Sequence, residues 1–335
     1  MQQSEYRSFE TLAQNAAMSN EFKGNLFEYM VAHTLARELR LEEQFIAHFS
    51  GVAKQQLGHY EAWLRKNNPK LIQKLPALAK STVAAIKGLL PKNLLNIHVI
   101  GKYSPPQLAA LYHEGDILLE NNLGDYTPLS LKLCKEHGFV NTKSGGVKSF
   151  LQKYFTAFEH SEFWQNSLNH QVQVSFQDML EKLYAVAGLE FTGRFDEQWQ
   201  GHGLSELPGQ LEGPYSVIVQ ESYREMSKVL YDAFVYLQNN DAVKFSECLL
   251  PLMGFGNRDL MQIICYHKDS DPRTIICEQY EEAREAAMTA KILQINQDIS
   301  SFVIQMKSRA LQIRIKPMNK FTVPGFKINC SVKRE

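Results

Sequence analysis

The sequence predicts a fold of the α/β (α+β) class, with a central mixed sheet flanked by helices and interrupted by helical insertions. Three observations favour it. Apolar residues recur at helical spacing over residues 20–49. The hydrophobic period shortens to two over residues 94–135, and alternation returns over residues 301–332. Because no repeat or clear linker separates these segments, we expect one continuous domain over residues 1–335.

Composition bounds the class of protein. The chain has 335 residues, of which 44% are hydrophobic and 21% charged, as in ordinary globular proteins. No apolar run approaches the ~20 residues of a membrane span, and the polar N-terminus lacks the apolar core of a signal peptide. The five cysteines form no C-x-x-C pair, which argues against a zinc site and favours reduced thiols. These features predict a cytoplasmic protein with no membrane partner.

Charge is segregated along the chain, although 36 basic and 36 acidic residues cancel overall. Residues 51–92 carry eight Lys/Arg and one acid, and residues 301–335 repeat those numbers. Residues 171–225 carry nine acids and three Lys/Arg. Basic blocks of this kind either form a surface that binds phosphates or are solvated faces of helices and strands.

The N-terminal part predicts helices. We expect a short helix over residues 5–17 and a long one over residues 20–49, followed by basic helices over residues 52–67 and 77–90. Glu28 lies among apolar neighbours on the long helix. It is either a surface residue at the edge of the apolar stripe or a buried acid with a functional role.

Two strands joined by a polar turn follow, over residues 113–135. A strand over residues 94–103 and a short helix over residues 107–113 precede them. Asp116 opens the first strand, and Ser130 and Lys132 lie two residues apart on the second. Since strand side chains alternate, these two share a face while the intervening leucines face the core. A lysine beside a strand-borne aspartate needs a partner, and a metal-bound phosphate is one candidate.

A glycine-containing segment comes next. Residues 144–146 (Ser-Gly-Gly) predict a turn, and a helix that begins near Val147 would direct its N–H groups to an anion. Lys143 and Lys148 flank it and are candidate contacts to DNA phosphates. A plain loop before a helix is the alternative.

The C-terminal half predicts helices over residues 156–190, 217–239 and 241–250, a strand over residues 260–267 and a charged helix over residues 278–297. Residues 192–216 contain five glycines and two prolines, which predicts a long loop that either closes on a ligand or only connects helices.

The tail predicts three strands, over residues 301–306, 310–315 and 326–332. Alternation in LQIRIKP places Arg314 and Lys316 on one face and the aliphatic side chains on the other. We expect this basic face to contact the DNA groove or backbone.

The order of these elements resembles the PD-(D/E)XK nuclease superfamily, which has the restriction-endonuclease-like fold. Gly115-Asp116 corresponds to the first motif, and Ser130-Leu131-Lys132, separated from Asp116 by thirteen residues, to the second. Glu28, in GNLFE, corresponds to the helix acid. The resemblance covers about residues 20–155, with the basic helices as an insertion, and leaves residues 156–335 unassigned.

The resemblance implies a Mg²⁺- or Mn²⁺-dependent phosphodiesterase. Asp116 would bind the metal, and Glu28, or alternatively Glu120 on the strand of Asp116, would add a ligand. Lys132 would position the nucleophilic water, and Ser130 would contact water or phosphate. Ser130 stands where the superfamily has an acid, and Gly115 (next to Asp116) where it has a proline. The number of metals therefore stays open, as does a catalytically inactive nucleic-acid-binding protein on the same fold.

The expected activity is a type II restriction or phage-defence endonuclease acting on double-stranded DNA. Cutting both strands requires two active sites, which is consistent with a homodimer, and a restriction enzyme would have a cognate methyltransferase. The sequence lacks a P-loop, a dinucleotide-binding glycine motif, a nucleophile elbow and an H-E-x-x-H motif. A scaffold protein that binds no nucleic acid is a third alternative.

Overall fold

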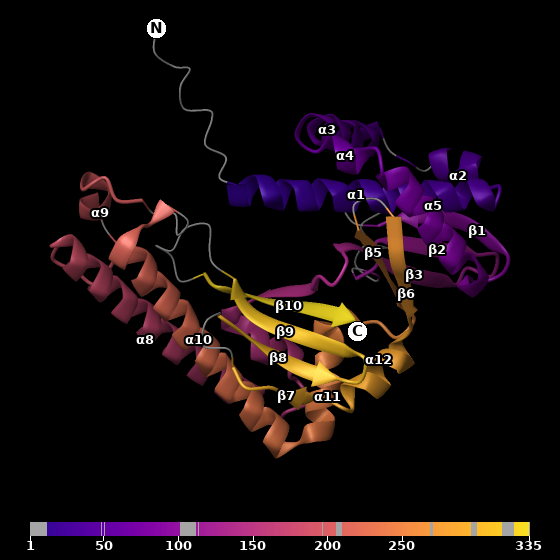
Figure 1. Cartoon of the computed structure of the whole chain (residues 1–335). Helices are drawn as coiled ribbons and strands as arrows, with labels where there is room; N and C mark the ends of the chain where they lie inside the picture. The colour runs from indigo at the N-terminus through magenta and orange to yellow at the C-terminus, as the bar shows by residue number, and fades with distance from the viewer. Residues whose placement is uncertain are drawn as a thin grey trace, which may run out of the picture. The chain divides into compact units, whose positions relative to one another are not determined.

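The chain forms two compact units in the computed structural model, which describes residues 12–47, 49, 51–100, 112, 114–195, 197–205, 210–268, 271–295, 300–316 and 325–334. Unit 1 comprises residues 1–138 and 257–280, and unit 2 comprises residues 139–256 and 281–335 (Figure 1). Each contains one five-stranded sheet, so the predicted mixture of helices and sheet is confirmed. The strands predicted over residues 301–306, 310–315 and 326–332 belong to the second sheet and not to the sheet that contains β2 and β3.

Unit 1 combines a mixed sheet with a helical layer. Its helices are α1 (Leu12–Glu38), α2 (Glu42–Ala47), α3 (Gly51–Asn67), α4 (Pro69–Ile72), α5 (Leu75–Ile86) and the 3₁₀ helix η1 (Lys87–Leu89). Its strands are β1 (Leu94–Val99), β2 (Ile117–Asn121), β3 (Tyr126–Lys135), β5 (Met261–Lys268) and β6 (Asp271–Glu278). The strand order is β1-β2-β3-β5-β6, and every neighbouring pair is antiparallel except β3 and β5, which run parallel.

The long first helix differs from the prediction. The sequence predicted a break near residues 19–20, whereas α1 continues through them. No proline or glycine interrupts the chain between Leu12 and Gly24, so the polar residues there remain helical. The part of the predicted short helix before residue 12 lies outside the described residues.

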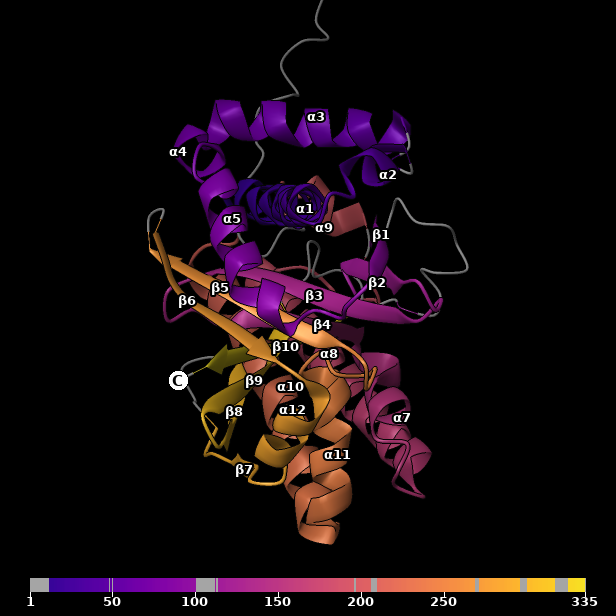
Figure 2. The same ribbon diagram turned by 90° about the vertical axis from the view of Figure 1, so that its right-hand side faces the viewer.

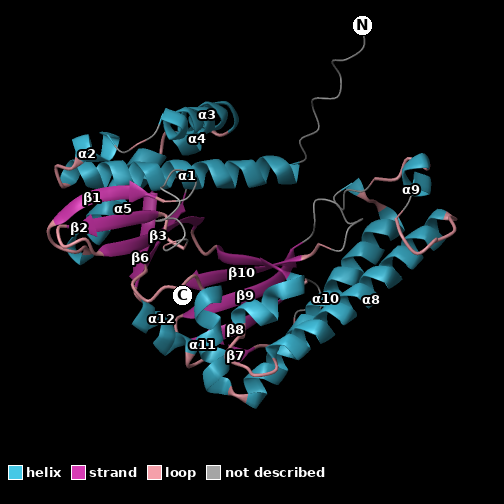
Figure 3. Ribbon diagram, turned by 180° about the vertical axis from the view of Figure 1, so that it is seen from behind, coloured by secondary structure: helices cyan, strands magenta, loops and turns pink. Residues whose placement is uncertain are grey.

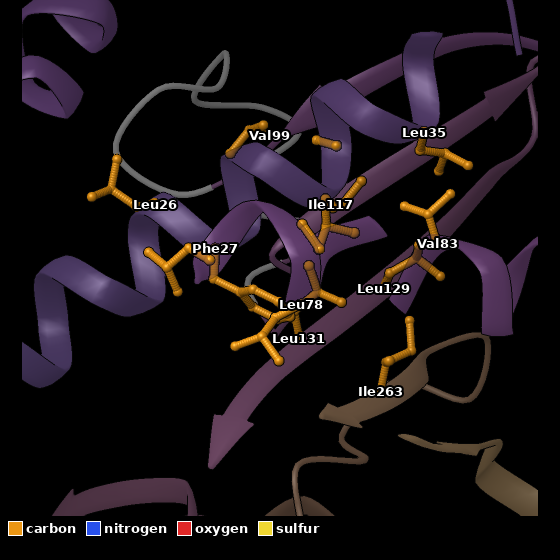
Figure 4. Packing of buried hydrophobic residues seen from close by; sticks show 14 of the residues in the cluster. Leu26, Phe27, Leu35, Leu78, Val83, Val99, Ile117, Leu129, Leu131 and Ile263 are labelled. Atoms are coloured by element: carbon orange, nitrogen blue, oxygen red, sulfur yellow. The ribbon is translucent and has the colours of Figure 1, made fainter. Parts of the chain in front are cut away.

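The core of unit 1 lies between the sheet and the helices α1 and α5. Figure 4 shows the side chains that fill it, which are Leu26, Phe27 and Leu35 of α1, Leu78 and Val83 of α5, and Val99, Ile117, Leu129, Leu131 and Ile263 of the sheet. Leu129 and Leu131 are 0% and 2% exposed, so the predicted leucine face is confirmed. Burying each leucine contributes about 1.5–3 kcal/mol. This packing fixes β3 and therefore the residues on its other face.

Unit 2 combines an antiparallel sheet with long helices. Its helices are the 3₁₀ helix η2 (Val147–Ser149), α7 (Phe150–Tyr154), α8 (Ser161–Ala187), α9 (Glu197–Gly201), α10 (Gly213–Asn240), α11 (Ala242–Leu252) and α12 (Tyr280–Ala287). Its strands are β4 (Val140–Gly146), β7 (Lys291–Ile292), β8 (Ser301–Met306), β9 (Arg309–Lys316) and β10 (Lys327–Arg334). The strand order is β4-β10-β9-β8-β7.

Helices cover one face of this second sheet. α8 and α10 run side by side, as Figure 3 shows, and α10 packs on β8 and β9 (Figure 2). Phe302 of β8 contacts Tyr231 and Phe234 of α10, with ring centroids 5.4 and 5.3 Å apart. Along β9, the predicted alternation is confirmed, because the aliphatic residues are buried while Arg314 and Lys316 are exposed.

Several local predictions for the rest of the chain are wrong. Residues 144–146 belong to β4 instead of a turn, and the helix predicted over residues 278–297 ends at Ala287. β6 was not predicted. The loop predicted over residues 192–216 contains α9, whose Trp199 is fully buried, although residues 196 and 206–209 lie outside the described residues. Among the described helices, none is long and apolar enough to cross a membrane.

Candidate active site

The backbone of Asp116 is held from two sides at the start of β2. Its N–H donates to the carbonyl of Leu129 on β3 (2.7 Å), and its carbonyl accepts from the N–H of Ile100 after β1 (2.9 Å). The residue therefore lies between two neighbouring strands. These bonds restrict the position from which its carboxylate leaves the main chain.

Gly115 explains one departure from the superfamily pattern. Its N–H donates to the carbonyl of Tyr112 (2.9 Å), a bond that proline lacks the N–H to form. A Cβ atom at this position would lie 3.1 Å from Pro128 Cβ and 3.3 Å from Ile100 Cδ1, closer than ordinary contact. The local packing thus favours glycine before the aspartate.

One carboxylate oxygen of Asp116 receives three donors from β3. Oδ2 accepts from the backbone N–H of Leu131 (2.6 Å), from Lys132 Nζ (3.1 Å) and from Ser130 Oγ (3.2 Å). In the described part of the chain, no hydrogen bond reaches Oδ1 of Asp116. The three bonds orient the carboxylate and leave one oxygen for a ligand.

Lys132 is a half-buried ammonium in contact with Asp116. The two side chains are 24% and 21% exposed. Burial alone would lower the pKa of Lys132, but the negative charges of Asp116 and Glu28 outweigh it and raise that pKa. Lys132 therefore stays protonated and acts as a positive charge and hydrogen-bond donor.

Glu28 on α1 joins this pair. It is half-buried and interacts electrostatically with both Asp116 and Lys132. Burial raises the pKa of Glu28 well above its usual value, Asp116 raises it further, and Lys132 opposes the change. Glu28 is therefore a partly buried acid and not a fully exposed surface residue. Across the described residues, no hydrogen bond reaches the Glu28 carboxylate.

Carboxyl groups such as those of Asp116 and Glu28 are of the chemical type that binds a hard divalent cation. Mg²⁺ often binds through one or two carboxylates and completes its shell with water and substrate phosphate. Asp116 Oδ1 and the Glu28 carboxyl supply such a pair, and neither is occupied by a hydrogen bond from the described residues. Three or more His, Cys, Asp or Glu side chains gathered at one metal-binding position are not found anywhere in the described ranges. A cation here would therefore depend on water and phosphate for its remaining ligands.

Glu120, the alternative ligand, is not brought to this site. Its Oε2 accepts from Asn96 Nδ2 (2.8 Å) and lies 3.0 Å from His98 Nε2. It also hydrogen-bonds to Tyr126. Asn96 and His98 were not singled out from the sequence, although alternation in LLNIHV places them on one face of β1. Their role appears only once the antiparallel register of β1 and β2 is known.

The glycine segment offers no anion site of the predicted kind. Residues 144–146 pair with β10, and the N–H of Val147 donates to the carbonyl of Phe326 (2.9 Å). At the start of α7, the N–H groups of Leu151 and Gln152 both donate to Gln165 Oε1 (2.7 and 3.4 Å). These backbone donors are therefore used within the protein.

The four predicted DNA contacts all lie in unit 2. Lys143 Nζ lies 5.9 Å from the ring centroid of Tyr154, a residue of α7, so it projects toward the helices. Lys148 is exposed in η2. Arg314 and Lys316 are exposed on β9.

Comparisons of the chain with models of protein families, with curated proteins and with solved structures found no match. We therefore base the functional proposal on the geometry of Asp116, Ser130, Lys132 and Glu28.

Proposed function

We propose that the protein is a metal-dependent endonuclease that hydrolyses phosphodiester bonds in double-stranded DNA, with a restriction-endonuclease-like core in unit 1. The observation that carries the proposal is the contact between Lys132 Nζ and Asp116 Oδ2 at 3.1 Å, beside the half-buried carboxyl of Glu28. The order of a glutamate-bearing helix and two strands bearing Asp and Lys supports it.

Each residue has a distinct role in this proposal. A bound Mg²⁺ or Mn²⁺ would make hydroxide available and neutralise phosphate charge. Asp116 and Glu28 would hold the ion. The Lys132 ammonium would orient the attacking water and offset charge on the phosphate, and Ser130 would keep the Asp116 carboxylate in place.

The geometry limits the role of Lys132. Because the Asp116 carboxylate, and Glu28 when it is ionised, raise the pKa of its amine, Lys132 stays protonated and is a poor base toward water in the metal-free protein. Proton removal therefore falls to another group, such as a phosphate oxygen or solvent, and Lys132 serves through its charge.

Cleavage of supercoiled plasmid by the purified full chain in Mg²⁺ or Mn²⁺ tests the proposal. We expect Asp116→Ala and Lys132→Ala each to lower the rate by at least about 10²-fold. Glu120→Gln is the matched control, since it removes a carboxylate from the same sheet but outside the site. Cleavage by Asp116→Ala and Lys132→Ala at the parental rate would refute the assignment.

The second candidate is a nucleic-acid-binding protein without catalysis. Ser130 favours it, because a hydroxyl replaces a carboxylate at a position where an acid would bind metal. DNA that is retained in a gel shift but left intact across Mg²⁺ and Mn²⁺ concentrations would select this reading. If cleavage occurs, sedimentation with duplex bound will show whether two copies act together on the two strands.

A further inference from the structure

The charged residues of the unit 2 sheet are all basic. Its strands carry eight Lys/Arg, namely one on β4, one on β7, three on β9 and three on β10, and no Asp or Glu. The sheet of unit 1 is mixed in charge, with acids at Glu120, Asp271 and Glu278. Six of the eight Lys/Arg of residues 301–335 therefore lie on β9 and β10 of this sheet.

The polar side chains of this sheet line up across its strands. Ser144 Oγ donates to Asn329 Oδ1 (2.8 Å), and Asn329 lies opposite Arg314, which lies opposite Ser301. Ser144, Asn329, Arg314 and Ser301 thus form one row over β4, β10, β9 and β8. The alternating aliphatic side chains occupy the helix-covered face, so this row lies on the other face.

A pair of like charges lies beside this row. Lys327 of β10 is directly opposite Lys316 of β9, and both are exposed. Like charges in directly opposed positions destabilise a sheet. Arg314 lies two residues before Lys316 on β9, so this face carries three cations close together. An anion bound between them would offset their mutual repulsion.

The residue types of this face indicate which polyanion fits. Proteins that bind single strands on a sheet stack bases on aromatic side chains. Among the described residues of β4, β9 and β10, no aromatic residue occurs. Arginine, lysine, serine and asparagine are the side chains that contact the phosphates of a duplex.

We infer that the face of the unit 2 sheet carrying Arg314, Lys316 and Lys327 is a docking surface for double-stranded DNA, which contacts it through the phosphate backbone. It shares the substrate class of the proposed function but none of its chemistry. Binding needs neither metal nor the Asp116 site, so the two proposals can fail separately.

Fluorescence anisotropy with a labelled, mixed-sequence DNA duplex in EDTA tests this inference. The variant is the triple Arg314→Ala, Lys316→Ala, Lys327→Ala. The matched control, Lys182→Ala, Lys228→Ala, Lys244→Ala, removes three exposed lysines from the helices of the same unit. Each phosphate contact contributes about 0.9 to the slope of log affinity against log salt. We expect the sheet triple to reduce that slope by about 2 to 3 and the control to leave it unchanged.

A single-stranded DNA of the same sequence and phosphatidylserine vesicles are tested as alternative ligands of the same variants. A loss confined to the duplex supports the inference. The inference would be overturned by an equal loss of duplex affinity in both triple variants or by no loss in the sheet triple. A larger loss of affinity for the single-stranded DNA or the vesicles than for the duplex would also overturn it. If the parent protein does not cleave DNA but duplex binding is lost only in the sheet triple, the proposed function is contradicted and this inference is not.

A second measurement avoids mutation. In the parent protein, the duplex should protect Lys316 and Lys327, but not Lys244, from amine acetylation measured by mass spectrometry. Equal reactivity of Lys316 with and without duplex would contradict the inference even if the triple variant failed to fold.

Discussion

Replacing Glu28 by glutamine should stabilise the metal-free protein at neutral pH. Burial and the Asp116 charge raise the pKa of Glu28 well above its unfolded value. The native state then binds a proton that the unfolded state releases, so stability falls as pH rises from about 4.3 toward the folded pKa. Glutamine has no proton to lose and avoids this fall.

Each unit of pKa difference corresponds to about 1.4 kcal/mol. We therefore expect Glu28→Gln to be more stable than the parent at about pH 8, by about 1.4 kcal/mol for each unit by which folding raises the pKa of Glu28 within that range. At about pH 4 we expect no difference, because the parent carboxyl is protonated in both states. Hydrogen exchange of the β2 and β3 amides in EDTA reports on unit 1 directly. Saturating Mg²⁺ should reverse the order, because only the parent has both carboxyl groups for the ion.

Glu120→Gln is the control of opposite sign. Burial alone would raise the pKa of Glu120, but hydrogen bonds from His98 and Asn96 outweigh it and lower that pKa. Its carboxylate therefore adds stability above about pH 4.3, which is lost as pH falls through the folded pKa, and glutamine should destabilise at neutral pH. If Glu28→Gln also destabilises the metal-free protein at about pH 8, Glu28 is a favourably paired anion and the reasoning is refuted.

Three further predictions concern packing around the site and in unit 2. Lys132→Ala should cost about 1–3 kcal/mol in the same exchange experiment, because Asp116 loses a charged donor while Glu28 stays nearby; an unchanged free energy would contradict the ion pair. Gly24→Ala should stabilise α1 by about 0.5–1 kcal/mol, since the added Cβ would lie at an ordinary 3.9 Å from Glu28 Oε1. A lower melting temperature for this variant than for the parent would contradict the prediction. Gln165→Ala should cost about 1–3 kcal/mol in urea unfolding of unit 2, as it leaves two N–H groups of α7 without their acceptor.

The local alternation of apolar and polar residues predicted those strands that have one face toward a core and one face away from it. The alternation of leucine with Ser130 and Lys132 located β3, and the alternation in LQIRIKP located β9. β6 was missed because its apolar residues are consecutive (Ile275, Ile276 and Cys277), which gives no period of two. Residues 144–146 form a strand through pairing with β10, and small polar side chains carry no signal of such pairing.

The site shows the same division between local and distant information. The spacing along the chain predicted that Lys132 lies on the face toward Asp116, because the two residues belong to adjacent strands of one hairpin. It could not place Glu28, since the rotation of α1 over the sheet depends on contacts with residues far along the chain. Glu120 was an alternative ligand from the sequence alone. The register of β1 and β2 places Asn96 opposite Glu120 and His98 nearby, and both side chains hydrogen-bond to its carboxylate.

Under the proposed function, Ser130 makes catalysis depend on the Glu28 carboxyl group. Its hydroxyl donates to the Asp116 oxygen that also accepts from Lys132, so it stabilises the aspartate without adding negative charge. A carboxylate at this position would repel Asp116 in the absence of a cation but would give the cation a second ligand on the sheet. With serine there, Glu28 is an acid that interacts electrostatically with both Asp116 and Lys132. If the protein cuts DNA, removing the Glu28 carboxylate should therefore impair cleavage more than removing the Ser130 hydroxyl.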